Sequence, residues 1–300
     1  MHSLGKVTVL AAWNLRCVCK NPRFFLCAAM AFLLCFLLSD HVTAAARHYQ
    51  TDLQLLELFI WCFSDSDSIF FAALALMLLL SPLPDLGPFC AYQLLRVNRG
   101  AWLLAQVLTM AMATALYMLV LLFSCVLLGM DVSFGANRWS ETAMLLSYMP
   151  AGSDIPVTVV RRAIRDTTPY GCALQIFLLL QAYMLLLSML QLAATLFRSR
   201  SAGMLLVLSA NLMGYALTPA RFITWLQLDS HAQYVANLLS AWLSPLQHAT
   251  YAMHSFGYDN LPALWQSHAI MLALSLILGI AAYRLFRTYP CNFHGGDDVE

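Results

Sequence analysis

The sequence contains few charged residues for its length. Of its 300 residues, 10% are Asp, Glu, Lys or Arg, whereas about a quarter of the residues in an ordinary soluble domain are charged. Hydrophobic residues make up 61% of the chain, and the mean hydropathy is +0.71. So few charges cannot cover that much apolar surface in water. The composition therefore excludes a typical soluble enzyme, a disordered chain and a nucleic-acid-binding protein, which needs a basic surface.

The signatures of common catalytic and nucleotide-binding sites are also missing. The chain has no G-x-x-x-x-G-K-[ST] phosphate loop, no H-E-x-x-H pair and no G-x-S-x-G turn. Its nine cysteines mostly lie in or beside apolar runs, and the close pair Cys17 and Cys19 lacks the second pair that a zinc site needs. We therefore expect no metal, no cofactor and no enzymatic activity in this chain.

Long apolar runs dominate the chain instead. A helix that spans a bilayer needs about 20 mostly apolar residues. Six runs reach or approach this length: Phe24–Ser39, Ser68–Leu83, Ala101–Met130, Gly171–Phe197, Ala202–Leu226 and His268–Tyr283. Asp65 to Ser68 offer capping residues for the second run, and prolines follow it. We predict an all-α polytopic membrane protein with six transmembrane helices in a single domain, whose bundle covers residues 23–288.

The charged residues are segregated along the chain. Ten of the sixteen Lys and Arg residues lie in the N-terminal segment and in every second connection: Lys6, Arg16, Lys20, Arg23, Arg96, Arg99, Arg198, Arg200, Arg284 and Arg287. Most Asp and Glu residues lie in the other connections. Because cytoplasmic loops are enriched in Lys and Arg, both termini, including the tail 289–300, are predicted to be cytoplasmic.

Residues 1–22 have the pattern of an amphipathic helix. At 100° per residue, one arc of this helix carries the polar and aromatic residues His2, Lys6, Trp13, Arg16 and Lys20, and the opposite side is apolar. We predict an interfacial helix on the cytoplasmic leaflet, in contact with membrane lipids through Lys6, Trp13, Arg16 and Lys20.

The sequence pattern also predicts ordered segments in two outer connections. Leu53–Phe63 is apolar but too short to span and contains Glu57, so we predict an outer amphipathic segment before the second span. In Gln227–Ser267, Asp229 or Ser230 can cap one helix, and Ser244-Pro245 can start another that ends at Gly257. These two short helices are expected to dip into the outer interface and pack on the bundle.

Ionisable side chains are missing from the middle of the six runs. Carriers driven by protons or sodium usually place such groups there, so we expect the energy for any uphill transport to come from another subunit. The neutral polar residues can either form hydrogen bonds between helices or contact a substrate. Three of them are candidates for a translocation path: Gln175, Gln181 and Asn211.

The connection between the second and third spans contains a short basic helix. Prolines end the second span, and an amphipathic helix at about Phe89–Arg96 follows. This helix can anchor the chain to the lipid surface or dock a soluble motor domain. The candidate docking residues are Phe89, Tyr92, Gln93, Arg96, Asn98 and Arg99.

This order of parts resembles the membrane subunit of type 2 ABC exporters. The resemblance rests on the N-terminal helix, the P-x-P exit at Pro82 and Pro84, the R-x-x-R-x-x-W entry at Arg96 to Trp102, and the short outer helices. It implies a permease in the bacterial cytoplasmic membrane that pairs with a second permease subunit, identical or homologous. It also implies separate ATP-binding subunits, which hold ATP and magnesium and grip the helix around Phe89–Arg99.

The substrate and two other classes of function stay open. A peptide, a lipid-like molecule or a drug-like molecule fits a largely apolar path. Arg161, Arg162 and Arg165 in an outer connection can meet anionic groups or form a solvated helix face. A membrane sensor or assembly protein would need no motor, and an intramembrane enzyme would need a buried catalytic pair that the sequence does not show.

Overall fold

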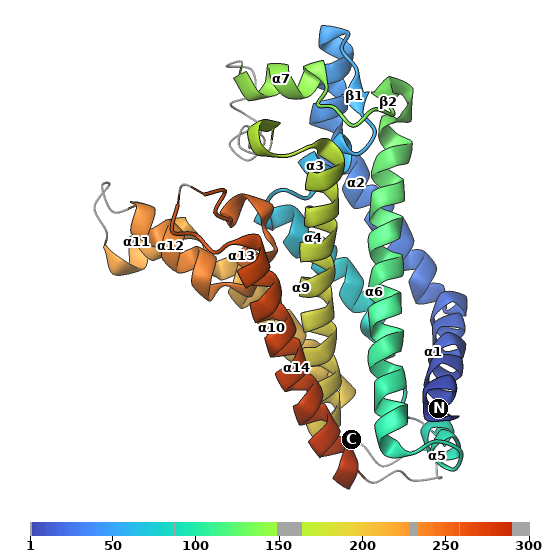
Figure 1. Cartoon of the computed structure of the whole chain (residues 1–300). Helices are drawn as coiled ribbons and strands as arrows, with labels where there is room; N and C mark the ends of the chain where they lie inside the picture. The colour runs from blue at the N-terminus through green and yellow to red at the C-terminus, as the bar shows by residue number, and fades with distance from the viewer. Residues whose placement is uncertain (1, 87, 149–163, 228–232, 258, 290–300) are drawn as a thin grey trace.

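The computed structural model describes residues 2–86, 88–148, 164–227, 233–257 and 259–289, which form an all-α bundle (Figure 1). Among these residues, four helices are apolar and long enough to cross a membrane: α2 (Pro22–Tyr49), α6 (Arg99–Gly129), α9 (Pro169–Phe197) and α14 (Leu264–Thr288). Such helices are compatible with an integral membrane protein, as the sequence predicts.

Two of the six predicted spans are less regular. Helix α4 (Ser66–Leu80) starts at the predicted cap, where the Asp65 side chain accepts a hydrogen bond from the Ser68 N–H, but it has only 15 residues. The fifth run forms α10 (Arg200–Ala216) and α11 (Pro219–Leu226), which meet at 73°. The predicted span Ala202–Leu226 is therefore interrupted, because Pro219 cannot extend the hydrogen bonding of α10 and holds Thr218 in an extended conformation.

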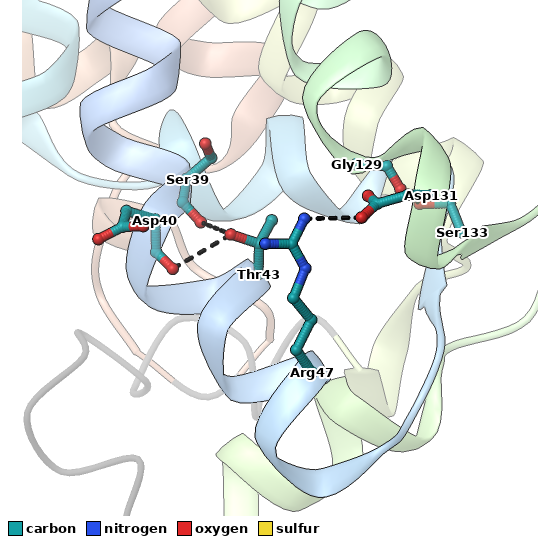
Figure 2. Close-up of polar contacts among 7 residues, drawn as sticks. All are labelled: Ser39, Asp40, Thr43, Arg47, Gly129, Asp131 and Ser133. Atoms are coloured by element: carbon teal, nitrogen blue, oxygen red, sulfur yellow. Dashed lines mark hydrogen bonds and ion pairs between the residues drawn. The ribbon is translucent and has the colours of Figure 1, made fainter.

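The helices run between two ends of the bundle, which we call the base and the head. On the side of the base, above α1 in Figure 1, the start of α2 meets the end of α4 through a 2.7 Å hydrogen bond from Arg23 to the Ser81 hydroxyl. At the head, the end of α2 meets the end of α6, where Arg47 and Asp131 form an exposed ion pair of 2.6 Å (Figure 2). Helices α2 and α6 therefore run in the same direction, and α4 returns the chain between them.

The charge segregation of the sequence is also a segregation in space. The start of α1 (His2–Lys20), α5 (Pro88–Leu94) and the end of α14 lie together at the base (Figure 1). Arg200 on α10 donates to the Pro84 carbonyl at this end. Asp131 and Glu57 lie in the head instead, together with α7 (Glu141–Tyr148).

Helix α9 forms the centre of the bundle. In its most apolar stretch 56% of the residues are buried, against 22% in α14, so α9 is enclosed by protein and α14 lies at the edge. The outer faces of α2 and α14 expose large apolar side chains such as Phe36 and Ile277. Such a surface requires a cover of lipid or another protein.

Helix α1 confirms the predicted amphipathic pattern. Its Val7, Ala11 and Val18 are buried, whereas its four candidate interfacial residues are exposed: Lys6, Trp13, Arg16 and Lys20. The buried face packs on Ala105 and its neighbours, and α1 stands beside the lower part of α6 (Figure 1). The apolar face is therefore covered by α6, and burial of this face does not require a lipid leaflet.

The segment Leu53–Phe63 differs from its prediction. It forms strand β1 (Leu53–Gln54) and helix α3 (Glu57–Cys62), and every residue of both is buried. Strand β1 pairs in parallel with β2 (Ser133–Phe134), which follows η1 (Met130–Val132). The prediction that this segment is amphipathic was wrong, because α2, α6 and α9 all pack against α3 and bury every side of it.

The connection before α14 contains α12 (Gln233–Leu243), α13 (Pro245–Ala249) and η4 (Tyr251–Met253). Ser244 caps α13 as predicted, and its hydroxyl accepts from the Gln247 N–H. The helix ends at Ala249 rather than at the predicted Gly257, which lies further along with a φ of 99°. The predicted caps Asp229 and Ser230 lie outside the described residues, as does the tail from residue 290.

Candidate functional site

A groove at the base brings together two predicted sets of residues. It has a volume of about 1370 Å³ and lies between α1 and α5. Its walls carry Lys6 and Trp13 from α1, together with Tyr92, Gln93 and Arg96 from α5 and the turn after it. The candidate interfacial helix and the candidate docking helix therefore share one surface.

The groove has a basic and aromatic rim. The Arg96 side chain is exposed, and its main-chain carbonyl accepts a 3.3 Å hydrogen bond from the Lys6 ammonium. The Tyr92 side chain is 57% exposed and Leu95 is 72% exposed. This combination of two cations with aromatic and apolar surface suits an acidic, amphipathic partner.

Other predicted docking residues hold the surrounding structure together. The Gln93 side-chain oxygen accepts a 2.7 Å hydrogen bond from the Trp102 indole, and the Asn98 side chain caps α6 by accepting from the Ala101 N–H. Phe89 lies in α5, but its side chain is outside the described part of the structure. Gln93 and Asn98 therefore fix α5 relative to α6.

Arg99 closes the C-terminal end of α14. Its guanidinium donates to the carbonyl oxygens of Phe286, Arg287 and Tyr289 at 2.6, 2.9 and 2.9 Å. It also lies 5.7 Å from the centre of the Phe286 ring. The last carbonyls of a helix lack partners within the helix and favour a cation. Arg99 therefore has a structural role, and the exposed cations of the groove are Lys6 and Arg96.

The three candidate path residues bond to different neighbours. Gln175 accepts from the Tyr251 hydroxyl at 2.9 Å, and Gln181 donates to the Thr114 hydroxyl at 2.8 Å. The structure brings Asn211 together with Tyr183 on α9 and the Phe70 carbonyl on α4. Hydrogen bonding between chain segments, one of the two roles considered for these residues, is therefore what the geometry shows.

A buried carboxylate organises the head. Glu57 on α3 has no exposed surface, and its two oxygens accept from the N–H and the hydroxyl of Ser140 at 2.7 and 2.5 Å. The Gln54 N–H donates to it as well, at 3.2 Å. Ser140 directly precedes α7, so the carboxylate lies at the positive end of that helix. Burial raises the pKa of Glu57, although these hydrogen bonds oppose the rise.

A cluster of two buried histidines and a serine was not predicted from the sequence. His248 lies in α13, His254 follows η4, and both rings contact the hydroxyl of Ser267 on α14. Burial lowers the pKa of His248, and it lowers the pKa of His254 to about 4. The available signal was three histidines, His231, His248 and His254, in a connection whose only other ionisable charges are acidic, but spacing alone did not show that two of them meet.

The described residues contain no group of three or more His, Cys, Asp or Glu side chains arranged to hold a metal ion. Of the outer arginines, Arg165 is exposed, whereas Arg161 and Arg162 lie outside the described residues. No family model matches the chain, and no curated protein or solved structure matches it either. The inference of function therefore depends on the groove, the buried groups and the pattern of charge.

Proposed function

We propose that this chain is the permease subunit of a transporter driven by a separate ATPase, of the type 2 ABC exporter kind. The observation that carries the proposal is the groove between α1 and α5, with Arg96 and Tyr92 on its exposed rim. A soluble ATPase subunit with a complementary acidic and apolar surface would dock there.

The contacts around α5 support transmission of force into the bundle. Gln93 joins α5 to Trp102 on α6, and the Trp102 ring stacks on Phe286 of α14 with 4.5 Å between ring centres. Arg99 at the start of α6 is bonded to the same end of α14. A movement of α5 would therefore displace α6 and α14 together, which is what a docked motor requires.

Six membrane spans are part of this proposal. Helices α2 and α6 run from base to head, so α4 returns the chain between them, and α10 returns it between α9 and α14. Helix α4 is only about 22 Å long, against a hydrocarbon core of about 30 Å, so the bilayer or the flanking residues would adjust to it. The basic base would face the cytoplasm and place both termini there.

In this proposal a second permease subunit, identical or homologous, completes the translocation path. Each chain would be passive, while ATP and magnesium bind to the partner ATPase. The ATPase shifts the permease between two states only if ATP binding has different affinities for those states. A peptide, a lipid-like molecule or a drug-like molecule would suit the apolar interior.

The test is isolation of the full chain from its native membranes with whatever ATPase accompanies it. We expect a phosphate-loop ATPase at fixed stoichiometry, and we expect Arg96→Glu to reduce its recovery about tenfold, which corresponds to roughly 1.4 kcal/mol. Arg198→Glu is the control, because Arg198 is an exposed cation of the base outside the groove.

A second measurement uses transport by the reconstituted complex. Arg96→Glu should abolish substrate-stimulated ATP hydrolysis and leave the thermal stability of the permease unchanged. Transport by the pure chain without an ATPase, or full stimulation in the Arg96→Glu complex, would contradict the proposal. A chain that performs its role with no ATPase partner would instead be the motor-independent sensor or assembly protein.

A further inference from the structure

A buried serine lies between two histidine rings where α13, η4 and α14 meet. The Ser267 hydroxyl oxygen is 2.9 Å from His248 Nδ1 and 2.9 Å from His254 Nε2. Ser267 and His254 have no exposed surface, and His248 is 3% exposed. These three residues form one hydrogen-bonded unit, the His–Ser–His cluster, which is shielded from water.

The second nitrogen of each ring faces a main-chain carbonyl. His254 Nδ1 lies 3.0 Å from the Thr250 oxygen and shares its hydrogen with the Tyr251 oxygen at 3.3 Å, and His248 Nε2 lies 3.3 Å from the Trp242 oxygen. A carbonyl oxygen can only accept a hydrogen bond. Each of these two ring nitrogens must therefore carry a hydrogen if the contact is a hydrogen bond.

The neutral cluster has too few hydrogens to form a hydrogen bond at each of the four ring nitrogens. A neutral imidazole carries one N–H, and in both rings that hydrogen is directed at a carbonyl. Both nitrogens that face Ser267 are then acceptors, but the hydroxyl has only one hydrogen to donate. The neutral cluster therefore makes three hydrogen bonds and one contact between two lone pairs.

One additional proton removes this conflict. With one ring as imidazolium, its N–H donates to the Ser267 oxygen while the Ser267 hydroxyl donates to the other ring. All four contacts are then hydrogen bonds, and one of them is charge-assisted. We propose that the His–Ser–His cluster is a binding site for a single proton, and that proton uptake fastens the end of α12 to α13 and α14.

The contact from His248 to the Trp242 oxygen is the link that the proton controls. At 3.3 Å it is longer than the 2.9 Å contacts to Ser267, and it reaches the last turn of α12. In the other neutral arrangement, the His248 hydrogen lies on Nδ1 and is donated to Ser267, which leaves a lone pair of Nε2 facing the Trp242 oxygen. Protonation restores the N–H there and ties α12 to the bundle.

The surroundings set the pH range in which the site fills. Burial lowers the pKa of both rings, and His248 and His268 lower the pKa of His254 further, to about 4. Titratable side chains on the elements packed around the cluster include His268 on α14, Tyr251 in η4, Cys172 on α9, Asp67 on α4, Tyr215 on α10 and Tyr234 on α12. The negative charge of Asp166 contributes to the raised pKa of Tyr251, whose hydroxyl donates a hydrogen bond to Gln175. The cluster is therefore empty at neutral pH and fills in acid.

The experiment is NMR of the full chain in lipid nanodiscs, labelled with nitrogen-15 in histidine and titrated from pH 8 to pH 4. His248→Gln and His254→Gln assign the signals. We expect one of the two rings to become imidazolium while the other remains neutral with its hydrogen on the carbonyl-facing nitrogen. The site assignment is overturned if both rings stay neutral until the protein unfolds, or if both become charged.

A second measurement tests whether proton uptake fastens the end of α12. With 5-fluorotryptophan in the same sample, the Trp242 signal, assigned by Trp242→Phe, should shift in the same pH step. Ser267→Ala should move the step to lower pH, because the imidazolium loses its acceptor, whereas the control His41→Gln, at an exposed position of α2 outside the cluster, should keep it. If Ser267→Ala does not fold, the wild-type titration still decides. An unmoved Trp242 signal would overturn the fastening, and neither outcome depends on the docking groove.

Discussion

The base and the head each close a helix end with a charged side chain of the sign that the helix requires. At the base, Arg99 donates to three carbonyl oxygens at the C-terminal end of α14. In the head, Glu57 accepts from Ser140 beside the N-terminal end of α7. The partial charges of the two helix ends explain why a cation serves one and an anion the other.

The two ends differ in their access to water. Arg99 is half-buried, whereas Glu57 has no exposed surface. Water can replace the Arg99 contacts if that side chain is removed, but it cannot reach the donors around Glu57. The comparison indicates that the base is built as an accessible surface and the head as a closed assembly, so equivalent substitutions should have unequal effects.

The largest effect is expected at Glu57. Glu57→Ala should lower the free energy of unfolding by about 3 kcal/mol, because the Ser140 and Gln54 donors would remain buried without an acceptor. Thermal and chemical denaturation in detergent would measure it. The control is Glu141→Ala, which removes an exposed carboxylate from the first turn of α7, the helix whose start Glu57 faces, and should change little. Equal effects of the two substitutions would show that the buried contacts of Glu57 do not stabilise the head more than an exposed carboxylate does.

A smaller loss is expected at the contact between α9 and α10. A Cβ atom on Gly203 would lie 2.6 Å from the Thr195 hydroxyl and 3.2 Å from the Gln191 carbonyl, so the α9 backbone must yield. Gly203→Ala should cost about 2 kcal/mol in denaturation experiments. Gly279→Ala on α14 meets no atom within 4 Å and should be neutral or stabilising. Destabilisation by both would mean that helix flexibility, not close packing, is responsible.

Removal of the Arg99 side chain should have a modest and local effect. Arg99→Gln should destabilise the chain by about 1 kcal/mol and increase hydrogen exchange at residues 284–288, because the last carbonyls of α14 lose their donor. Arg96→Gln at the exposed rim of the groove should leave both measurements unchanged. An unchanged exchange pattern in Arg99→Gln would show that the cap does not hold α14.

The stability that Glu57 contributes to the head should depend on pH. The folded-state pKa of Glu57 is raised by burial, so the native state holds this proton more tightly than the unfolded state. Stability from this group is therefore present at acidic pH and decreases as the pH rises from about 4.5, the ordinary value, through the raised pKa. The difference between wild type and Glu57→Gln across this range isolates the effect, and parallel profiles would contradict it.

Local signals in the sequence predicted the elements but not their partners. Asp65 and Ser244 mark helix starts because a capping side chain bonds within its own first turn. Arg99 was grouped with Arg96 by spacing, yet its acceptors lie at least 187 positions further along the chain. Glu57 was placed on an outer amphipathic segment, because its partner Ser140 is 83 positions away and sequence spacing does not show such a contact.

The sequence by itself determined the all-α class, the apolar runs and the concentration of cations at one end, since each follows from the composition and period of contiguous residues. Only the tertiary structure decided which charges became buried, where the fifth run turns, and that two histidines share one serine. Those outcomes depend on the distances between side chains from separate helices, because burial and hydrogen bonding are properties of neighbours in space.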